Sequence, residues 1–250
     1  MGFFDKILKF DNVKNVGLLN MTDEFFALYV KKLFECNNQG ILIVTPSLYE
    51  ANKIYSSVNN YVSSYLFQDD EFLMKKMVKS NELLSERLDV LNNLIVNNKQ
   101  VVITDTAGYL KFLPGVDSYK RRVIKLKVGD CVSYEKLISD LNDLGYARES
   151  IVSKTGDMAV RGFVIDLFVI NDDNPIRIEF FGDEIESIRY FSAESQMSLD
   201  SVSEKDILPF NEECFDDVCN ILSYLRDPIV IFKDYEQIKT TYLNMCNEVL

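Results

Sequence analysis

Hydrophobic residues in the first part of the chain fall into two patterns, continuous runs and runs with helical spacing. Ile41–Thr45 and Val101–Thr104 are almost wholly apolar, as expected of strands covered on both faces. Ser47 and Glu50 form a capping box after the first run, and a buried helix is predicted from there to Val62. Two more helices are predicted from one apolar face each: Phe25, Phe26, Tyr29, Val30 and Leu33, and Leu84, Leu88, Leu91 and Ile95. Strands alternating with helices predict a parallel sheet with helices packed against it.

The middle of the chain carries shorter patterns after a boundary near Pro114–Asp117. Hydrophobic and polar residues alternate over Arg121–Val128, which predicts a half-buried strand. A helix is predicted next, with its apolar face at Leu137, Ile138, Leu141 and Leu144. We expect this helix to stop at Gly145, because glycine readily adopts the left-handed conformation that ends helices.

Two β-rich segments, Val160–Phe168 and Ile176–Arg189, lie on either side of a turn at Asn171–Pro175. Successive side chains of a strand point to opposite faces, so the second segment has two different faces. One face is apolar, with Ile176, Ile178 and Phe180, and the other is mixed, with Arg177, Glu179 and Phe181. The apolar face suits a core. The mixed face has an unusual composition for a face that contacts only solvent.

The last part of the chain returns to the first pattern. Pro228–Phe232 is predicted to be a short strand, and a helix is predicted to start near Tyr235. We expect this strand to rejoin the first sheet, which makes the middle of the chain an insertion. The predicted domains are therefore residues 1–117, an inserted α+β module at residues 118–209, and a return segment at residues 210–250.

Composition excludes several classes of protein. The formal charge of −12 argues against a dedicated nucleic-acid-binding protein, since phosphate contacts require a concentrated basic surface. With no histidine and no Cys-x-x-Cys pair among five cysteines, neither a metal site nor a His-dependent catalytic group is expected. The dispersed cysteines fit a reducing cytoplasm, and no apolar run approaches the ~20 residues that span a membrane. Residues 1–10 lack signal-peptide features and are expected to pack on the body as a short amphipathic segment.

The two β-rich segments resemble a known family. They are similar to the second domain shared by the nucleotide excision repair protein UvrB and the transcription-repair coupling factors (Mfd). The similarity continues through Phe191, Ser195, Gln196 and Ser198 to Ile207-Leu208-Pro209. Less specific matches extend it over nearly the whole chain, at Phe67, Asp70, Glu71, Leu73, Ser85 to Leu88, Val90, Leu91, Leu113 and Pro114. In this family the domain is a small α/β module that docks onto the damage-recognition protein UvrA.

The resemblance raises the question of a nucleotide site. A helicase-like domain needs a glycine-rich loop with a lysine and a Ser/Thr before its first helix, to hold phosphates and magnesium. At the matching place, residues 17–25 contain one glycine and no Gly-Lys-Thr, and Asp23 and Glu24 add negative charge. Asp234 follows the last predicted strand, but Tyr235 stands where the magnesium-binding motif has glutamate. A lone aspartate there is more often a turn or cap residue than a metal ligand, so no ATP hydrolysis is expected.

The missing phosphate loop separates the two relatives. UvrB has an intact loop near its start, whereas the N-terminal region of coupling factors has the same framework without one. The sequence is therefore identified as similar to the N-terminal, UvrB-like region of a transcription-repair coupling factor. The implied fold class is α/β: a helicase-like parallel-sheet domain that lacks a nucleotide site, with an inserted α+β UvrA-binding module.

The resemblance also implies site residues. In this family two arginines and an aromatic residue on the sheet surface of the second domain bind UvrA. The matching positions are Arg161 in Val-Arg-Gly, Arg177 in Ile-Arg-Ile and Phe181, the second phenylalanine of Phe-Phe-Gly. Arginine and aromatic residues are also enriched at protein–protein hot spots. The residues alone leave an alternative open, in which Arg177 pairs with Glu179 or a neighbouring strand and Phe181 is a core residue.

The function implied by the resemblance is that of a non-catalytic, monomeric protein-interaction region that recruits UvrA to stalled RNA polymerase in a bacterial cytoplasm. No cofactor or metal is expected. In the full-length family protein, regions absent from this chain bind RNA polymerase and double-stranded DNA and form an ATP-dependent DNA translocase. One alternative is a fragment of a UvrB-type ATP-dependent DNA helicase, with Asp234 as a magnesium ligand. Another is a stand-alone decoy that sequesters UvrA.

Overall fold

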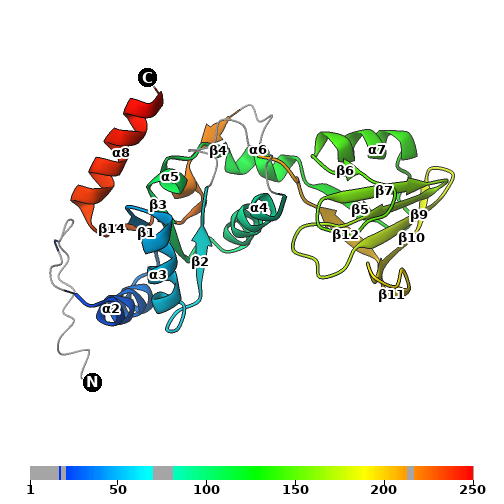
Figure 1. Cartoon of the computed structure of the whole chain (residues 1–250). Coiled ribbons are helices and arrows are strands. Elements are labelled where there is room, and N and C mark those ends of the chain that lie inside the picture. The colour runs from blue at the N-terminus through cyan, green and yellow to red at the C-terminus, as the bar shows by residue number, and fades with distance from the viewer. Residues whose placement is uncertain (1–16, 18–20, 70–80, 213–216, 250) are drawn as a thin grey trace. The chain divides into compact units, whose positions relative to one another are not determined.

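The computed structural model describes residue 17 and residues 21–69, 81–212 and 217–249. The chain forms two compact units (Figure 1). Unit 1 comprises residues 1–68, 97–110 and 225–250, and unit 2 comprises residues 69–96 and 111–224. The predicted amphipathic segment at residues 1–10 and the family matches at Asp70, Glu71 and Leu73 lie outside the described residues.

Unit 1 is built on a parallel sheet, as predicted from the alternation of strands and helices. Its strands are β1 (Ile41–Thr45), β2 (Ser64–Phe67), β3 (Val101–Asp105) and β14 (Ile229–Phe232), in the order β14-β1-β3-β2. Every residue of β1 and β3 is buried, which accounts for their continuous apolar sequences. Ile229 of β14 pairs with Ile41 of β1, so the expectation that the last strand rejoins the first sheet is confirmed.

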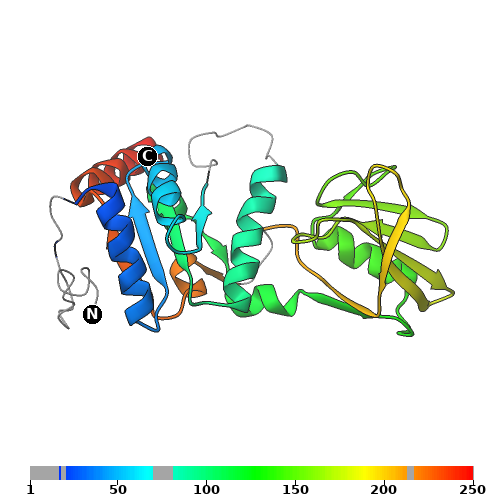
Figure 2. The ribbon, with the colours of Figure 1, turned by 90° about the horizontal axis from the view of Figure 1, so that it is seen from below.

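The described helices of unit 1 cover both faces of this sheet. They are α2 (Asp23–Cys36), α3 (Leu48–Val58), α5 (Thr106–Leu110) and α8 (Tyr235–Val249). Helices α2 and α3 share a core with one face of the sheet, and α8 lies on the opposite side (Figures 1 and 2). The predicted cap of α3 is confirmed, because the Ser47 hydroxyl accepts a hydrogen bond of 3.4 Å from the Glu50 backbone N–H.

Unit 2 contains a six-stranded sheet with one helix, α7 (Tyr134–Asp143), beside it (Figure 1). Its strands are β6 (Ala147–Arg148), β7 (Asp157–Arg161), β8 (Val164–Leu167), β9 (Ile176–Phe181), β10 (Glu184–Phe191) and β11 (Ser198–Val202). They lie in the order β11-β10-β9-β8-β7-β6, antiparallel except for the parallel pair β6–β7. Gly145 follows α7 with a φ of +99°, as its predicted role as a helix terminator requires.

The remaining parts of unit 2 are short strand pairs and helices. They are α4 (Asn81–Val96), β4 (Leu113–Pro114), α6 (Val116–Arg121), β5 (Ile124–Lys127), β12 (Glu204–Ile207), β13 (Val218–Cys219) and the 3₁₀ helix η2 (Ile221–Tyr224). Strand β5 is shorter than the predicted Arg121–Val128, because helix α6 takes up Arg121. Arg87 of α4 donates two hydrogen bonds of 2.9 Å to the Glu212 carboxylate, which ties α4 to the segment that follows β12 within unit 2.

Each of the two β-rich segments is a hairpin, which the sequence reading did not predict. The β7–β8 and β9–β10 connections have two-residue loops, Gly162-Phe163 and Gly182-Asp183. The glycines have φ values of +56° and +65°, as a two-residue hairpin loop with glycine first requires. Both tips lie at the same end of the sheet, because β8 and β9 are antiparallel neighbours. None of the helices in the described parts of the chain is long and apolar enough to cross a membrane.

Candidate functional site

The register of the β7–β10 strands places the three predicted site residues on one face of the sheet. Arg161 of β7 is opposite Val164 of β8, which is opposite Glu179 of β9. Directly opposed residues of antiparallel strands share a face, and Arg177, Glu179 and Phe181 share a face by strand period. We call this the mixed face, defined by Arg161, Arg177, Glu179 and Phe181. The other side of β9 is the apolar one, with Ile176, Ile178 and Phe180 buried.

Arg177 is held by the sheet itself. Its Nε and Nη2 groups donate hydrogen bonds of 2.6 and 2.8 Å to the two carboxylate oxygens of Asp166 on the neighbouring strand β8. Its guanidinium carbon lies 4.6 Å from the centroid of the buried Phe191 ring. The hydrogen bonds from Arg177 to Asp166 are the main reason that its pKa is raised, so the side chain stays charged. The alternative of a pair with a neighbouring strand is thus borne out for Arg177.

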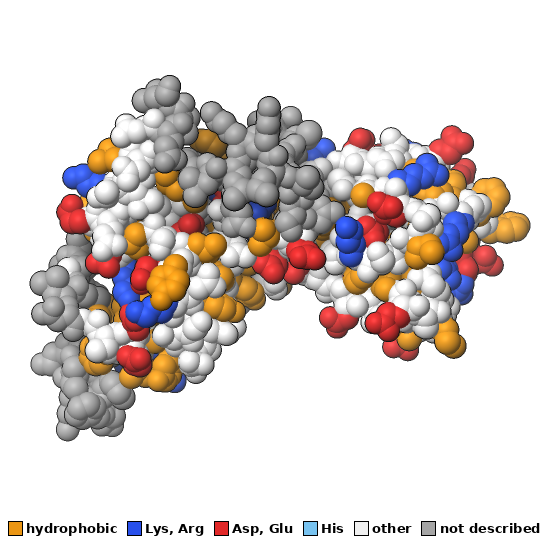
Figure 3. All heavy atoms as spheres, viewed as in Figure 1, with side chains coloured by type: hydrophobic (Ala, Val, Ile, Leu, Met, Phe, Trp, Pro, Cys, Tyr) orange, Lys and Arg blue, Asp and Glu red, His pale blue; other side chains and the backbone are white. Residues whose placement is uncertain are grey.

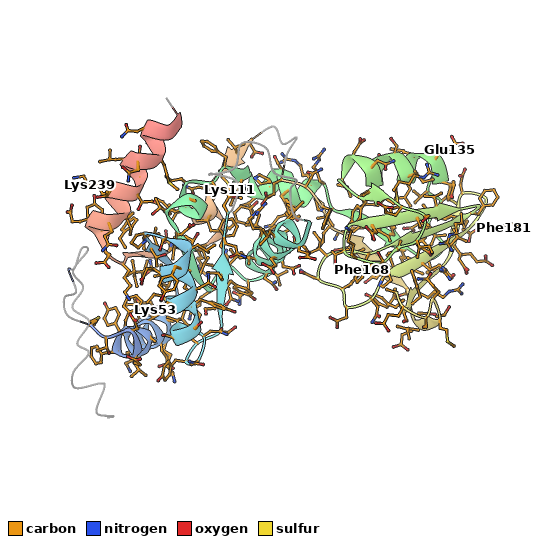
Figure 4. The ribbon with its side chains drawn as sticks, in the orientation of Figure 1. Lys53, Lys111, Glu135, Phe168, Phe181 and Lys239 are labelled. Carbon is orange, nitrogen blue, oxygen red and sulfur yellow. The ribbon has the colours of Figure 1, made fainter. Side chains whose placement is uncertain are left out.

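Phe181 is the most exposed of the predicted site residues. The residue is 79% exposed, so the alternative that it is a core residue is wrong. Figure 4 shows its ring at the hairpin end of the sheet, directed away from the strands. Because the ring stays in contact with water, it contributes little hydrophobic stabilisation to the fold. The exposed ring is therefore available for contact with a partner surface.

Arg161 ends strand β7 and is exposed. Its Nη2 group donates a hydrogen bond of 2.8 Å to the Ser150 carbonyl. Two strand spacings separate Arg161 from Glu179, which is about 10 Å. Arg177 and Phe181 are four residues apart along one strand, which is about 14 Å. The three residues therefore span one continuous part of the mixed face, and do not converge on a single point.

The structure shows how Glu179 of the mixed face is held, and it adds Ser187, Arg189 and Asp166 as the partners of the charged residues on this face. Glu179 accepts a hydrogen bond of 2.8 Å from the Ser187 hydroxyl and is also paired with Arg189. Asp166 has a side chain only 3% exposed and serves as the counter-ion of Arg177. The alternation within each strand was visible in the sequence. The register that pairs Asp166 with Arg177 was not, because it depends on how the connection between β8 and β9 is folded.

Within the segment considered for a phosphate loop, Asp23 belongs to an ion cluster in unit 1. Thr22 caps α2, and its hydroxyl accepts a hydrogen bond of 3.3 Å from the Phe25 N–H. The next residue, Asp23, pairs with Lys53 at 2.8 Å and with Lys233. Hydrogen bonds from Lys233 and then Lys53 lower the pKa of Asp23. In the described ranges, no group of three His, Cys, Asp or Glu side chains is arranged to hold a metal ion.

The sequence that forms the sheet with the mixed face matches a known family of domains. Residues 124–212 match the model of the UvrB interaction domain. This range includes all of β5 to β12 and the residues Arg161, Arg177 and Phe181.

Longer similarity connects the chain to particular proteins. It is 29% identical to the transcription-repair-coupling factor of Bacillus subtilis strain 168 over 206 aligned residues, and this alignment covers 81% of the chain. It is 31% identical over 212 residues to the transcription-repair-coupling factor of Staphylococcus aureus strain USA300, which covers 83% of the chain. The matches span 18% and 17% of the length of these two relatives. The predicted resemblance to the UvrB-like region of transcription-repair coupling factors is therefore confirmed.

Proposed function

We propose that the chain is a non-catalytic region of a transcription-coupled DNA repair factor, and that the mixed face binds UvrA. The observation that carries the proposal is the register of β7, β8 and β9, which places Arg161, Arg177 and Phe181 together within the matched UvrB interaction domain. Binding there recruits UvrA to stalled RNA polymerase in the bacterial cytoplasm. Contacts to RNA polymerase and to DNA belong to other regions of the full-length relatives.

The chemistry of the mixed face suits a protein partner. Phe181 provides an exposed ring, and aromatic and arginine side chains are those enriched at the centres of interfaces. Arg161 and Arg177 offer N–H donors to carbonyl or carboxylate groups on the partner. Because Asp166 and Phe191 orient Arg177 in the free protein, little side-chain freedom is lost when it binds.

The absence of catalysis and the domain limits are part of the same proposal. We assign unit 1 to the helicase-like framework of this family, without a working nucleotide site. The ion cluster of Asp23 with Lys53 and Lys233 supports this assignment, since it holds a carboxylate where a phosphate loop is expected. Residues 118–209 are proposed as the interaction module, and the matched range 124–212 supports those limits.

The first test removes the two exposed members of the face. We expect the Arg161→Ala/Phe181→Ala double variant to bind purified UvrA at least about thirtyfold more weakly than the wild-type chain, by titration calorimetry. Both side chains are exposed, so the variant is expected to keep its fold, which circular dichroism and thermal melting check.

The matched control removes the same chemistry elsewhere in unit 2. Lys127 and Phe112 are exposed, and Phe112 is 78% exposed, so Lys127→Ala/Phe112→Ala also deletes one cation and one aromatic ring. This control is expected to bind like the wild type. Equal weakening of both variants shows an unspecific effect of charge and apolar area and contradicts the proposal. A folded wild-type chain that does not bind UvrA also contradicts it.

A further inference from the structure

A second exposed aromatic ring lies at the hairpin end of the sheet. Phe163 is the second residue of the β7–β8 loop and is 59% exposed. It comes two residues after Arg161. Its carbonyl accepts a hydrogen bond of 2.9 Å from the Phe180 N–H, which places it next to the backbone that leads into Phe181. Hydrophobic, basic and acidic side chains lie near each other on this part of unit 2 (Figure 3).

Phe163 is held in place by contacts from a separate element. Its ring centroid lies 5.8 Å from that of Tyr134, the first residue of α7. The Tyr134 hydroxyl donates a hydrogen bond to the Gly162 carbonyl in the same hairpin loop. The Tyr134 ring also packs edge-on against Phe180, with centroids 5.3 Å apart, and Phe180 is only 6% exposed. The loop is therefore anchored to the core of unit 2 through Tyr134.

An exposed ring that is fixed in this way is well suited to binding. Burying a phenylalanine ring against a partner removes a large apolar area from water. A side chain that is already ordered loses less conformational freedom on binding than a mobile one. Tyr134 and its hydrogen bond to the loop supply that order, while Phe163 remains exposed.

The size of the mixed face indicates that its contact extends further. Arg177 and Phe181 span about 14 Å, whereas a standard protein interface buries about 800 Å² on each partner and is about 30 Å across. The additional area has to come from surface around these residues, and the hairpin loops next to Phe181 and Arg161 are part of that surface. Phe163 adjoins both of them along the chain and through its hydrogen bond to Phe180.

We infer that Phe163 is a second aromatic anchor of the proposed UvrA-binding surface, which continues from the mixed face around the hairpin tips. The inference rests on the proposed function. It specifies the chemistry of the partner, which offers an apolar recess for the Phe163 ring beside the acceptors that meet Arg161. Phe181 and Phe163 then contact the partner from the β9–β10 hairpin and the β7–β8 hairpin, respectively.

The test compares single variants in the full chain by titration calorimetry with purified UvrA. Phe163→Ala is expected to weaken binding about tenfold, and Phe163→Tyr, which keeps the ring, to stay within about threefold of the wild type. Phe112→Ala, which removes another exposed ring from unit 2, is expected to leave binding unchanged. Thermal melting confirms that each variant is folded, and Phe163→Leu replaces Phe163→Ala if the latter is not.

The outcomes separate the two proposals. The inference about Phe163 is overturned if folded Phe163→Ala (or Phe163→Leu, where it is used instead) binds UvrA with wild-type affinity. If Arg161→Ala/Phe181→Ala binds weakly in the same experiment, the proposed function stays in place. Weakening by Phe112→Ala equal to that by Phe163→Ala also overturns the inference, because the effect is then not local. No binding by the wild-type chain overturns both.

Discussion

Arg177 contributes to the fold and to the proposed interface through different atoms of one guanidinium group. Of the five N–H donors in a guanidinium, two are bound to Asp166. In the proposed interface, the others donate to acceptors on the partner. The Asp166 side chain is 3% exposed, so its charge depends on Arg177 for compensation. Arg161 and Phe181 differ in this respect, since their side chains are exposed and contribute little to the fold.

At the residue scale, Arg177→Ala is therefore expected to lower the free energy of unfolding by about 3 kcal/mol, because it leaves the Asp166 carboxylate buried without its cation. The Asp166→Asn/Arg177→Gln pair, which removes both charges and keeps polar groups in place, is expected to lose less. Urea denaturation followed by circular dichroism measures both.

Equal stability of Arg177→Ala and the wild type contradicts the structural role of the pair. Loss of binding in the double variant, with the fold retained, shows that the pair of Arg177 and Asp166 contributes to the interface.

At the element scale, the two hairpins determine where the aromatic side chains of the site are placed. Gly162 and Gly182 each occupy the first position of a two-residue loop with positive φ. A Cβ atom added at either position meets no atom within 4 Å, so the requirement for glycine comes from the backbone conformation and not from crowding. The loops turn the chain at the same end of the sheet, next to Phe163 and Phe181.

Gly182→Ala is expected to destabilise the chain by about 1–2 kcal/mol, since an L-residue at a φ of +65° is strained even in open space. Gly17→Ala is the control, because a Cβ there also meets no atom within 4 Å and its φ is outside the left-handed region. That substitution is expected to change stability by less than about 0.5 kcal/mol. Chemical denaturation of the two variants in parallel gives the comparison, and equal effects would show that the positive φ of Gly182 carries no cost.

At the scale of the whole molecule, the chain leaves unit 1 and returns to it. Strand β14 pairs with β1, although their residues are almost two hundred positions apart, as in the pair Ile41 and Ile229. Unit 2 lies within this path, so its sheet with the mixed face is attached to unit 1 through several chain segments. The ion cluster at Asp23 likewise draws Lys53 and Lys233 from distant parts of the sequence into unit 1.

Magnesium-ATP is expected to leave the melting temperature of the purified chain unchanged. A ligand that binds only the folded state must raise it, and the place matching a phosphate loop contains Asp23 and Glu24 instead of Gly-Lys-Thr. Differential scanning fluorimetry with magnesium-ATP, and with magnesium tripolyphosphate as a control for anion effects, measures the shift. A rise with ATP alone favours the alternative of an ATP-dependent helicase fragment and contradicts the proposed absence of a nucleotide site.

The sequence was sufficient for features that depend on local chain geometry. The buried strands β1 and β3 were predictable, because a strand covered on both faces has a short, continuous apolar sequence. The two faces of β9 were predictable for a similar reason, since the alternation of side chains is a property of the strand itself. The family resemblance pointed to Arg161, Arg177 and Phe181, and their common face follows from strand period and register together.

Only the tertiary structure decided which side chains meet. Asp166 is the counter-ion of Arg177 because the register of β8 against β9 aligns them, and register depends on the folded connections and not on strand period. Phe163 is exposed and ordered because Tyr134, from a helix nearly thirty residues earlier, supports its loop. Pairings between distant residues are set by the packing of whole elements, which no local pattern of hydrophobic and polar residues encodes.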